Sequence, residues 1–163
     1  MGGRRSPAER GEVRVGAVAG CAAGALFFDD EGRVLVVEPT YKPRWEIPGG
    51  MVEPGETPHE GCVREVAEEL GLSVAVGRLL VVDWAPHPDH GDKVLFVFDG
   101  GPLRAAAVAA IRLPADELAA YAFVAGDEVG EWLPPRLTRR VTEALRARAD
   151  GITRYLENGV PAP

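Results

Sequence analysis

Residues 50–72 read GMVEPGETPHEGCVREVAEELGL, and this stretch carries the signals for both ends of a helix. At its start, Thr57 is a helix-capping residue type, Pro58 suits the first helical position, and Glu60 completes a capping-box pattern. At its end, Gly71 can adopt the left-handed backbone conformation that terminates helices. The sequence therefore predicts a helix over residues 58–70, preceded by a loop rich in Gly, Pro and Glu.

Three carboxylates gather on one face of this predicted helix. The apolar residues recur at helical spacing, at Val63, Val66, Ala67 and Leu70, and predict one buried stripe. At about 100° per residue, Glu65, Glu68 and Glu69 fall on the opposite face. Such a group has two interpretations. It can be a solvated acidic face, which is the ordinary role of exposed charge runs, or a site for a hard divalent cation such as Mg²⁺ or Mn²⁺.

The spacing of the fixed residues favours the second interpretation. The pattern is Gly50, five residues, Glu56, seven residues, and then Arg64-Glu65-Val66-Ala67-Glu68-Glu69-Leu70-Gly71-Leu72. It resembles the Nudix box, Gly-x5-Glu-x7-Arg-Glu-(apolar)-x-Glu-Glu-x-Gly-(apolar), at every fixed type and at both apolar positions. A chance match is on the order of 10⁻⁸ per starting point if each fixed type fills about one position in fifteen.

The resemblance implies a fold, a reaction and a set of residue roles. The fold would be of the α/β class, a Nudix-type α/β/α sandwich around a mixed β-sheet. The reaction would be metal-dependent hydrolysis of a pyrophosphate bond, with Mg²⁺ or Mn²⁺ held by Gly50, through its carbonyl, and by Glu65, Glu68 and Glu69. Glu65, or an acid from a later loop, would act as general base. Glu56 and Arg64 would pair and hold the loop against the helix.

Other candidate site residues lie outside this stretch. For a later acid that completes the site, the resemblance suggests Glu117, with Asp127 and Glu128 as alternatives. For substrate binding, the aromatic residues that could stack on a base are Tyr41, Trp45, Phe123 and Trp132, and Arg44 could meet a phosphate. His87 and His90 flank a loop without zinc-ligand spacing and are candidates for substrate contact or for a plain surface loop.

The substrate remains open between several Nudix activities. Pro86 and Pro88 lie some fifteen residues beyond the box, as in some ADP-ribose hydrolases, which favours ADP-ribose or a nucleotide sugar. The first alternative is a nucleoside triphosphate pyrophosphohydrolase, including one that removes oxidised dGTP. An alternative of another class is a nucleotide-binding module of the same fold without catalysis. A Cys-dependent diphosphate isomerase finds no clear counterpart, because Cys62 lies on the box helix.

Composition limits the partners. The chain has 163 residues with a net charge of −7, and the stretch from Asp29 to Glu69 holds an acidic excess as large as that of the whole chain. Phosphate-neutralising binders of long nucleic acid are usually basic, so we expect a small-molecule nucleoside diphosphate derivative instead. The N-terminal patterns that resemble targeting signals are short, and we expect a cytoplasmic protein without a membrane partner. The resemblance also allows a homodimer, although the sequence offers no apolar seam for one.

The composition along the chain predicts a flexible tail over residues 1–14 and one domain over residues 15–163. We expect strands at Ala17–Phe28, Val34–Val37, Val74–Asp83, Val94–Asp99 and Phe123–Val124. Arg104–Leu113 fits either a strand or a helix, and Asp116–Ala120 favours a helical turn. Pro135 is expected to begin a final helix that runs to about Ala149, with Leu137, Val141, Ala144 and Leu145 on one face.

Overall fold

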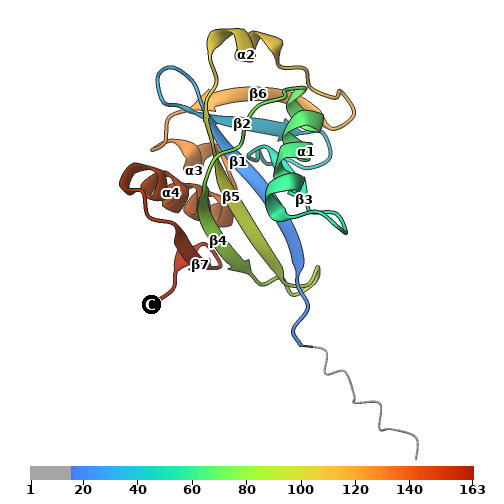
Figure 1. Ribbon diagram of the computed structural model, residues 1–163, viewed down its shortest axis with the longest axis vertical. Helices are drawn as coiled ribbons and strands as arrows, with labels where there is room; N and C mark the ends of the chain where they lie inside the picture. Colours follow the sequence, from blue (N-terminus) through green and yellow to red (C-terminus); the bar gives the residue numbers. More distant parts are fainter. Residues whose placement is uncertain (1–15) are drawn as a thin grey trace, which may run out of the picture.

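The computed structural model describes residues 16–163, so the predicted tail over residues 1–14 lies outside the described residues. The strands are β1 (Gly20–Phe28), β2 (Val34–Pro39), β3 (Gly49–Met51), β4 (Leu79–Ala85), β5 (Lys93–Pro102), β6 (Leu118–Val124), β7 (Arg154–Glu157) and β8 (Val160–Pro161). The helices are α1 (Pro58–Leu70), α2 (Ala105–Ala110), α3 (Val129–Trp132) and α4 (Pro135–Asp150). Figure 1 shows their arrangement.

The strands form one mixed sheet in the order β6-β2-β1-β5-β4-β7-β8, and β3 pairs with β1 beside this path. The pairs β1–β5 and β4–β7 are parallel, and the other pairs are antiparallel. β1 lies inside the sheet and pairs with three strands, β2, β3 and β5. The predicted mixed sheet is confirmed.

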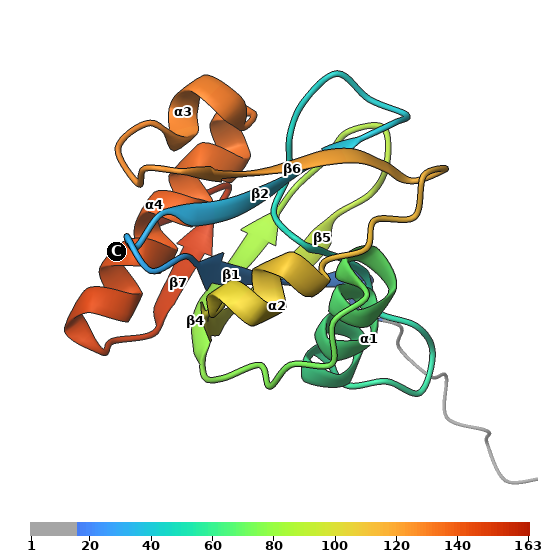
Figure 2. The ribbon, with the colours of Figure 1, turned by 90° about the horizontal axis from the view of Figure 1, so that it is seen from above.

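Two apolar cores cover the two faces of the sheet. Side chains of β1 alternate between them, with Ala25 and Phe27 in one core and Leu26 and Phe28 in the other. The first core is completed by α1 and by partly buried residues of α2, and the second by α3 and α4. Figure 2 shows α1 and α2 on one side of the sheet and α3 and α4 on the other. The predicted α/β/α sandwich is therefore confirmed.

Both predicted ends of α1 are confirmed. The Thr57 side chain accepts a hydrogen bond from the Glu60 backbone, and the Glu60 side chain accepts one from the Thr57 backbone, so the capping box is complete. At the other end, Gly71 has φ of 66° and donates its N–H to the Ala67 carbonyl. These caps fix α1 at the residues that the sequence indicated.

The predicted buried stripe of α1 is confirmed at Val66 and Leu70 and is wrong at Val63 and Ala67. Val63 is 37% exposed and Ala67 is exposed. The side chains buried in the core are Cys62, Val66 and Leu70. The helix is therefore rotated about its axis toward the side that carries Glu65 and Glu69, because the glycines of β3 allow that side to approach the sheet. As a result, these two glutamates are partly buried and not fully solvated.

Other elements differ from the predictions in their bounds. β4 begins at Leu79 and not at Val74, and the ambiguous stretch at residues 104–113 contains the short helix α2. The helical turn expected at Asp116–Ala120 ends at Leu118, where the longer strand β6 begins. The strands β3, β7 and β8 and the helix α3 were not expected, and β3 lies where a loop was predicted. Within residues 16–163, no helix combines the length and the apolar character that a membrane crossing needs.

Candidate active site

Two glycines bring α1 against the sheet. Gly49 and Gly50 pair with Gly24 and Ala23 of β1, and the Gly49 N–H donates to Glu69 Oε2 at 2.8 Å. A β-carbon on Gly50 would lie 2.6 Å from both carboxylate oxygens of Glu65. Only glycine at position 50 therefore leaves space for the Glu65 carboxylate beside β3.

Arg64 joins the loop to the helix. Its Nε donates to Glu56 Oε1 at 2.7 Å and its Nη2 donates to Glu56 Oε2 at 3.0 Å, a bidentate pair that confirms the predicted contact. Its Nη1 also contacts Glu65 at 2.9 Å and Glu68 at 3.2 Å, and its Nη2 donates to the Met51 carbonyl. The Arg64 guanidinium lowers the pKa of Glu56 below its usual range. Arg64 thus organises three carboxylates at the end of β3.

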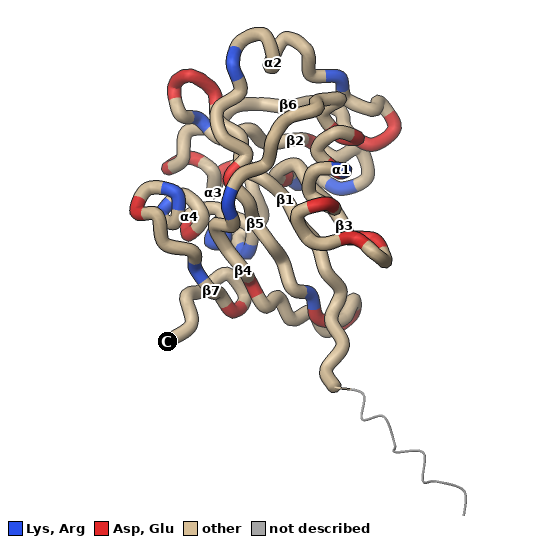
Figure 3. The backbone as a smooth tube through the Cα atoms, viewed as in Figure 1, with Lys and Arg blue, Asp and Glu red and all other residues tan. Residues whose placement is uncertain are grey.

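Glu69 has a strongly perturbed carboxylate. Burial raises its pKa to about 8, against the lowering effect of the Gly49 N–H, and the charges of Glu65, Glu46 and Glu117 raise it further. Glu68, by contrast, has a side chain that is 58% exposed. Figure 3 shows the acidic positions along α1 and the loop before it. A buried carboxylate among like charges is a setting in which a cation would be strongly stabilised.

Glu46 is a site residue that sequence reasoning missed. It lies in the loop after β2, and its backbone is bridged to Val37. Its side chain pairs with Lys42, and its charge acts on Glu69. No sequence signal singles it out, because an isolated Glu between Pro43 and Pro48 is ordinary for a surface loop. Glu117, which the sequence did suggest, also acts on Glu69, and its carbonyl accepts the Thr40 N–H.

The donor set fits a hard divalent cation, although the carboxylates are not gathered into a ready-made cluster. Among the residues that the structure describes, no three acidic, His or Cys side chains converge on one point. These carboxylates have other partners, because Glu65 and Glu68 accept hydrogen bonds from Arg64 and Glu69 accepts one from the Gly49 N–H. Carboxylate oxygens and the nearby Gly50 carbonyl are nonetheless the ligand types that Mg²⁺ and Mn²⁺ prefer.

A cavity of about 540 Å³ adjoins these residues. Gly49, Gly50 and Glu46 line it on the side of α1, and Tyr41, which is 71% exposed, lies at its margin. β1 and β5, the loop that contains His87 and His90, and the beginning of α4 line the rest. The predicted substrate residue Tyr41 and the two histidines therefore share a cavity with the box glycines.

The remaining predicted substrate residues do not line this cavity. The rings of Trp45 and Trp132 pack edge to face at 4.8 Å, against the core between the sheet and α4. Arg44 is exposed, and Glu128 lies at the N-terminus of α3. Neither tryptophan is placed to stack on a base in this cavity, because each covers the core instead.

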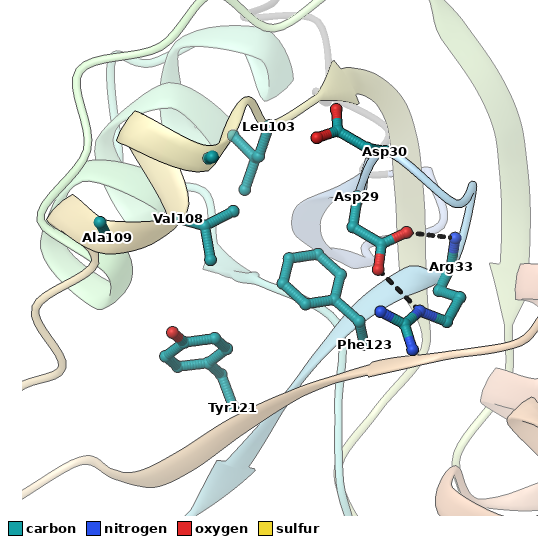
Figure 4. Close-up of a pocket in the computed structure, with 9 residues that line it drawn as sticks. Asp29, Asp30, Arg33, Leu103, Val108, Ala109, Tyr121 and Phe123 are labelled. Carbon is teal, nitrogen blue, oxygen red and sulfur yellow. Dashed lines mark hydrogen bonds and ion pairs between the residues drawn. The ribbon is translucent and has the colours of Figure 1, made fainter.

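Phe123 lies at a different, smaller hollow of about 350 Å³. In this hollow Phe123 and Tyr121 of β6 face Val108 of α2, and the Asp29–Arg33 ion pair closes one side (Figure 4). Unlike the larger cavity, which Gly50 and Met51 line, this hollow contains no residue of the box. The expectation that Phe123 stacks on a substrate base beside the box is therefore not supported by its position.

Comparison with known proteins decides the family. A family model described as the NUDIX domain matches residues 20–147, which is most of the chain. The chain belongs to the Nudix family. Its Nudix box is the segment that forms β3, the Arg64-bound loop and α1. The solved structure of the MutT protein from Methanosarcina mazei Go1 has the same fold, with a TM-score of 0.69 and 24% identity, covering 84% of this chain and 99% of that one.

Curated Nudix relatives match over shorter stretches. One is the "Putative 8-oxo-dGTP diphosphatase" of Bacillus subtilis (strain 168), 34% identical over 64 residues, which are 39% of this chain and 43% of that protein. Another is the ADP-ribose pyrophosphatase of Methanocaldococcus jannaschii, 43% identical over 70 residues, 40% of this chain and 41% of that protein. The chain thus spans less than half the length of each of these two relatives.

Proposed function

We propose that the protein hydrolyses a pyrophosphate bond in a nucleoside diphosphate linked to another group, with ADP-ribose or a nucleotide sugar as substrate. The observation that carries this proposal is the complete Nudix box, whose first residue, Gly50, lines a cavity large enough for a small ligand. The ADP-ribose pyrophosphatase among the relatives supports this choice of substrate.

Glu65, Glu68, Glu69 and the Gly50 carbonyl would hold the Mg²⁺ or Mn²⁺ ions. When bound, such ions neutralise charge on the diphosphate and lower the pKa of coordinated water. Glu65 or Glu117 would accept the proton of the attacking water as general base. Arg64 positions Glu65 and Glu68 through its contacts to both, and its pairing with Glu56 keeps the loop in place. Gly49 orients Glu69 through its N–H.

A second candidate is hydrolysis of a nucleoside triphosphate, including oxidised dGTP, and the name of the Bacillus subtilis relative supports it. A third, from another class, is nucleotide binding without catalysis. The complete set of box carboxylates opposes the third, because a binding module has no need of all of them.

A phosphate-release screen separates these candidates. The protein is incubated with Mg²⁺ or Mn²⁺ and coupled to a phosphatase, with ADP-ribose, sugar nucleotides, dinucleoside polyphosphates, dNTPs and oxidised dGTP as substrates. Preferential turnover of ADP-ribose or a sugar nucleotide supports the first candidate. Preferential turnover of a triphosphate favours the second. Metal-dependent binding of these compounds without turnover, in a folded protein, favours the third.

A further inference from the structure

The end of the cavity farthest from the box is formed by the β4–β5 loop, the start of β5 and the first turn of α4. His87 and His90 from the loop, Lys93 from β5 and Arg136 from α4 line it. The Arg136 Nη1 donates to the Pro86 carbonyl at 2.9 Å, which ties α4 to the loop. The two histidine rings lie against each other, with centroids 4.6 Å apart. We call these four residues the distal basic group.

The distal basic group has positive charge that no carboxylate neutralises. The cavity is lined by four Lys and Arg side chains and by one acidic side chain, Glu46. Lys42 pairs with Glu46, and Arg140 pairs with the buried Asp83. Within residues 16–163, neither Lys93 nor Arg136 has a carboxylate within ion-pair distance. This end is thus cationic in a chain whose net charge is −7.

The distal basic group also offers hydrogen-bond donors. Lysine and arginine side chains only donate. The His87 Nδ1 accepts the backbone N–H groups of Asp89 and His90, both at 3.2 Å, so the neutral ring carries its proton on Nε2. Asp89 and Asp92 belong to the same loop but do not line the cavity. A ligand group that meets these donors must be a strong acceptor, and a phosphate monoester is the acceptor that best fits paired basic side chains.

The part of the distal basic group that contains Arg136 is too far from the box for one diphosphate to reach both. Met51 of β3 pairs with Ala22 of β1, whereas Lys93 of β5 pairs with Gly20 of β1. Lys93 pairs in turn with Ala85 of β4, and Arg136 donates to the carbonyl of the next residue, Pro86. Ala85 is three strand spacings across the sheet and two residues along it from Met51, which together amount to about 16 Å between backbone positions. Two phosphorus atoms that share one bridging oxygen are much closer together than this. A second phosphate on the same ligand is needed to contact this end.

We infer that the distal basic group binds a further phosphate, remote from the scissile diphosphate, so that the substrate is a nucleoside diphosphate derivative that carries an additional phosphate monoester. This inference rests on the proposed function for the diphosphate itself. Within the proposed class, it favours a derivative of ADP-ribose or of a nucleotide sugar that carries such a phosphate over plain ADP-ribose, whose riboses offer only neutral hydroxyls to this end of the cavity.

Binding of matched nucleotides tests the inference without metal and without turnover. Calorimetry compares AMP with adenosine 2′,5′-bisphosphate and adenosine 3′,5′-bisphosphate, which differ from it by one phosphate monoester. We expect at least one bisphosphate to bind about tenfold more tightly than AMP, with the ratio falling at high salt. If neither bisphosphate binds more tightly than AMP, the inference is overturned.

Two variants and a control locate the effect. Lys93→Met keeps the aliphatic stem and removes the charge, and Arg136→Met does the same on α4. We expect each to lower the bisphosphate-to-AMP ratio severalfold and the double variant to bring it near one. Arg104→Met removes an exposed charge at the beginning of α2, away from the cavity, and should leave the ratio unchanged. A ratio that survives in Lys93→Met and in the double variant would contradict the assignment.

Hydrolysis of matched diphosphates then distinguishes this inference from the proposed function. Coenzyme A is compared with dephospho-coenzyme A, and NADPH with NADH, each with Mg²⁺ and with Mn²⁺. A higher kcat/KM for a phosphorylated member, lost in Lys93→Met, supports both proposals. Hydrolysis without preference for the phosphorylated member of either pair supports the proposed function and overturns the inference. If calorimetry shows a preference for a bisphosphate but no diphosphate is hydrolysed, the phosphate site of the distal basic group is supported and the proposed function is overturned.

Discussion

Asp83 on β4 and Arg140 on α4 form a buried ion pair, with Asp83 Oδ2 2.6 Å from Arg140 Nη2 and 2.7 Å from its Nε. Asp83 is 0% exposed, and its other oxygen accepts the Gly159 N–H at 2.9 Å. One carboxylate therefore joins the sheet, the last helix and the turn between β7 and β8. Because Arg140 also lines the cavity, this pair fixes one wall of the candidate substrate site.

Asp83→Ala should lower the free energy of unfolding by about 3–5 kcal/mol, because it leaves Arg140 buried without a partner. Urea unfolding followed by circular dichroism measures this loss. Asp150→Ala is the matched control, since it breaks an ion pair with Arg154 at the protein surface, and its unfolding midpoint should stay close to that of the wild type. Equal effects of the two substitutions would show that burial of the Asp83 pair has no special importance.

Glu68→Gln should lower turnover by at least about 100-fold, because loss of a metal-binding carboxylate should cost at least as much as loss of its supporting contacts. The fold should persist, since the Glu68 side chain is 58% exposed and lies at the protein surface. Glu53→Gln, which changes an exposed acid in the loop before α1, is the control and should retain activity. Wild-type turnover of Glu68→Gln at saturating Mg²⁺ would mean that the metal assignment is wrong.

Glu69 should make the stability of the metal-free protein depend on pH. Its pKa is about 8 in the folded protein, whereas the ordinary pKa of a glutamate is 4.5. Between these pH values the folded state therefore binds a proton on Glu69 that the unfolded state has lost. Stability should therefore fall as the pH rises from 4.5 to 8. Relative to Glu69→Gln, the wild type should lose about 4 kcal/mol over this range.

Unfolding of the two proteins at several pH values in chelator measures this difference. Saturating Mg²⁺ should reduce the slope of the wild type, because a bound cation would stabilise the ionised carboxylate. Parallel pH profiles for the wild type and Glu69→Gln would show that Glu69 ionises normally in the folded protein.

Gly50→Ala should displace Glu65, because the added β-carbon would lie 2.6 Å from both of its carboxylate oxygens. A displacement of about 1 Å at a catalytic group can lower the rate about 100-fold, and we expect a loss in kcat/KM of that order. Gly130→Ala is the control, since its β-carbon would be 3.4 Å from the nearest atom, a methyl group of Thr138. Normal activity of Gly50→Ala would show that Glu65 can move without consequence.

Cys62 should be unreactive toward Ellman's reagent in the folded protein. Burial, aided by the charges of Glu65 and Glu69, raises the pKa of its thiol to about 12, whereas Cys21 is only partly buried. At pH 8 we expect Cys62 to react at least about 100-fold more slowly than Cys21, and both to react in denaturant. Cys21→Ala should remove the fast phase. A fast phase that persists in Cys21→Ala would give Cys62 a reactive thiolate.

The elements that the sequence predicted well are those with local signals. The caps of α1 involve residues within a few positions of one another, and both ends of the helix were predicted correctly. β7 and β8 were missed because their place in the sheet depends on β4, some seventy residues earlier in the chain. The orientation of α1 was wrong because periodicity treats Glu as exposed. The periodicity of the sequence does not show that Gly49 and Gly50, which have no side chains, leave room beside β3 for Glu65 and Glu69.

The candidate site was predictable where it follows the box and not elsewhere. The Glu56–Arg64 contact follows from the motif alone. Glu46 and the distal basic group come from separate segments that only the sheet brings together, and each residue type alone is ordinary for a surface. Trp45 was a reasonable stacking candidate by residue type. Its contact with Trp132, nearly ninety residues later in the chain, was not visible in the sequence.

The contact between Gly159 and Asp83 also bears on where the folding unit ends. The family match stops at residue 147, three residues before the end of α4. A domain boundary drawn there by similarity would remove the backbone N–H that satisfies one oxygen of a fully buried carboxylate. We therefore expect the last strands to be needed for folding, because a fragment that ends at residue 147 would lack Leu156 from its core and the Gly159 N–H that contacts Asp83.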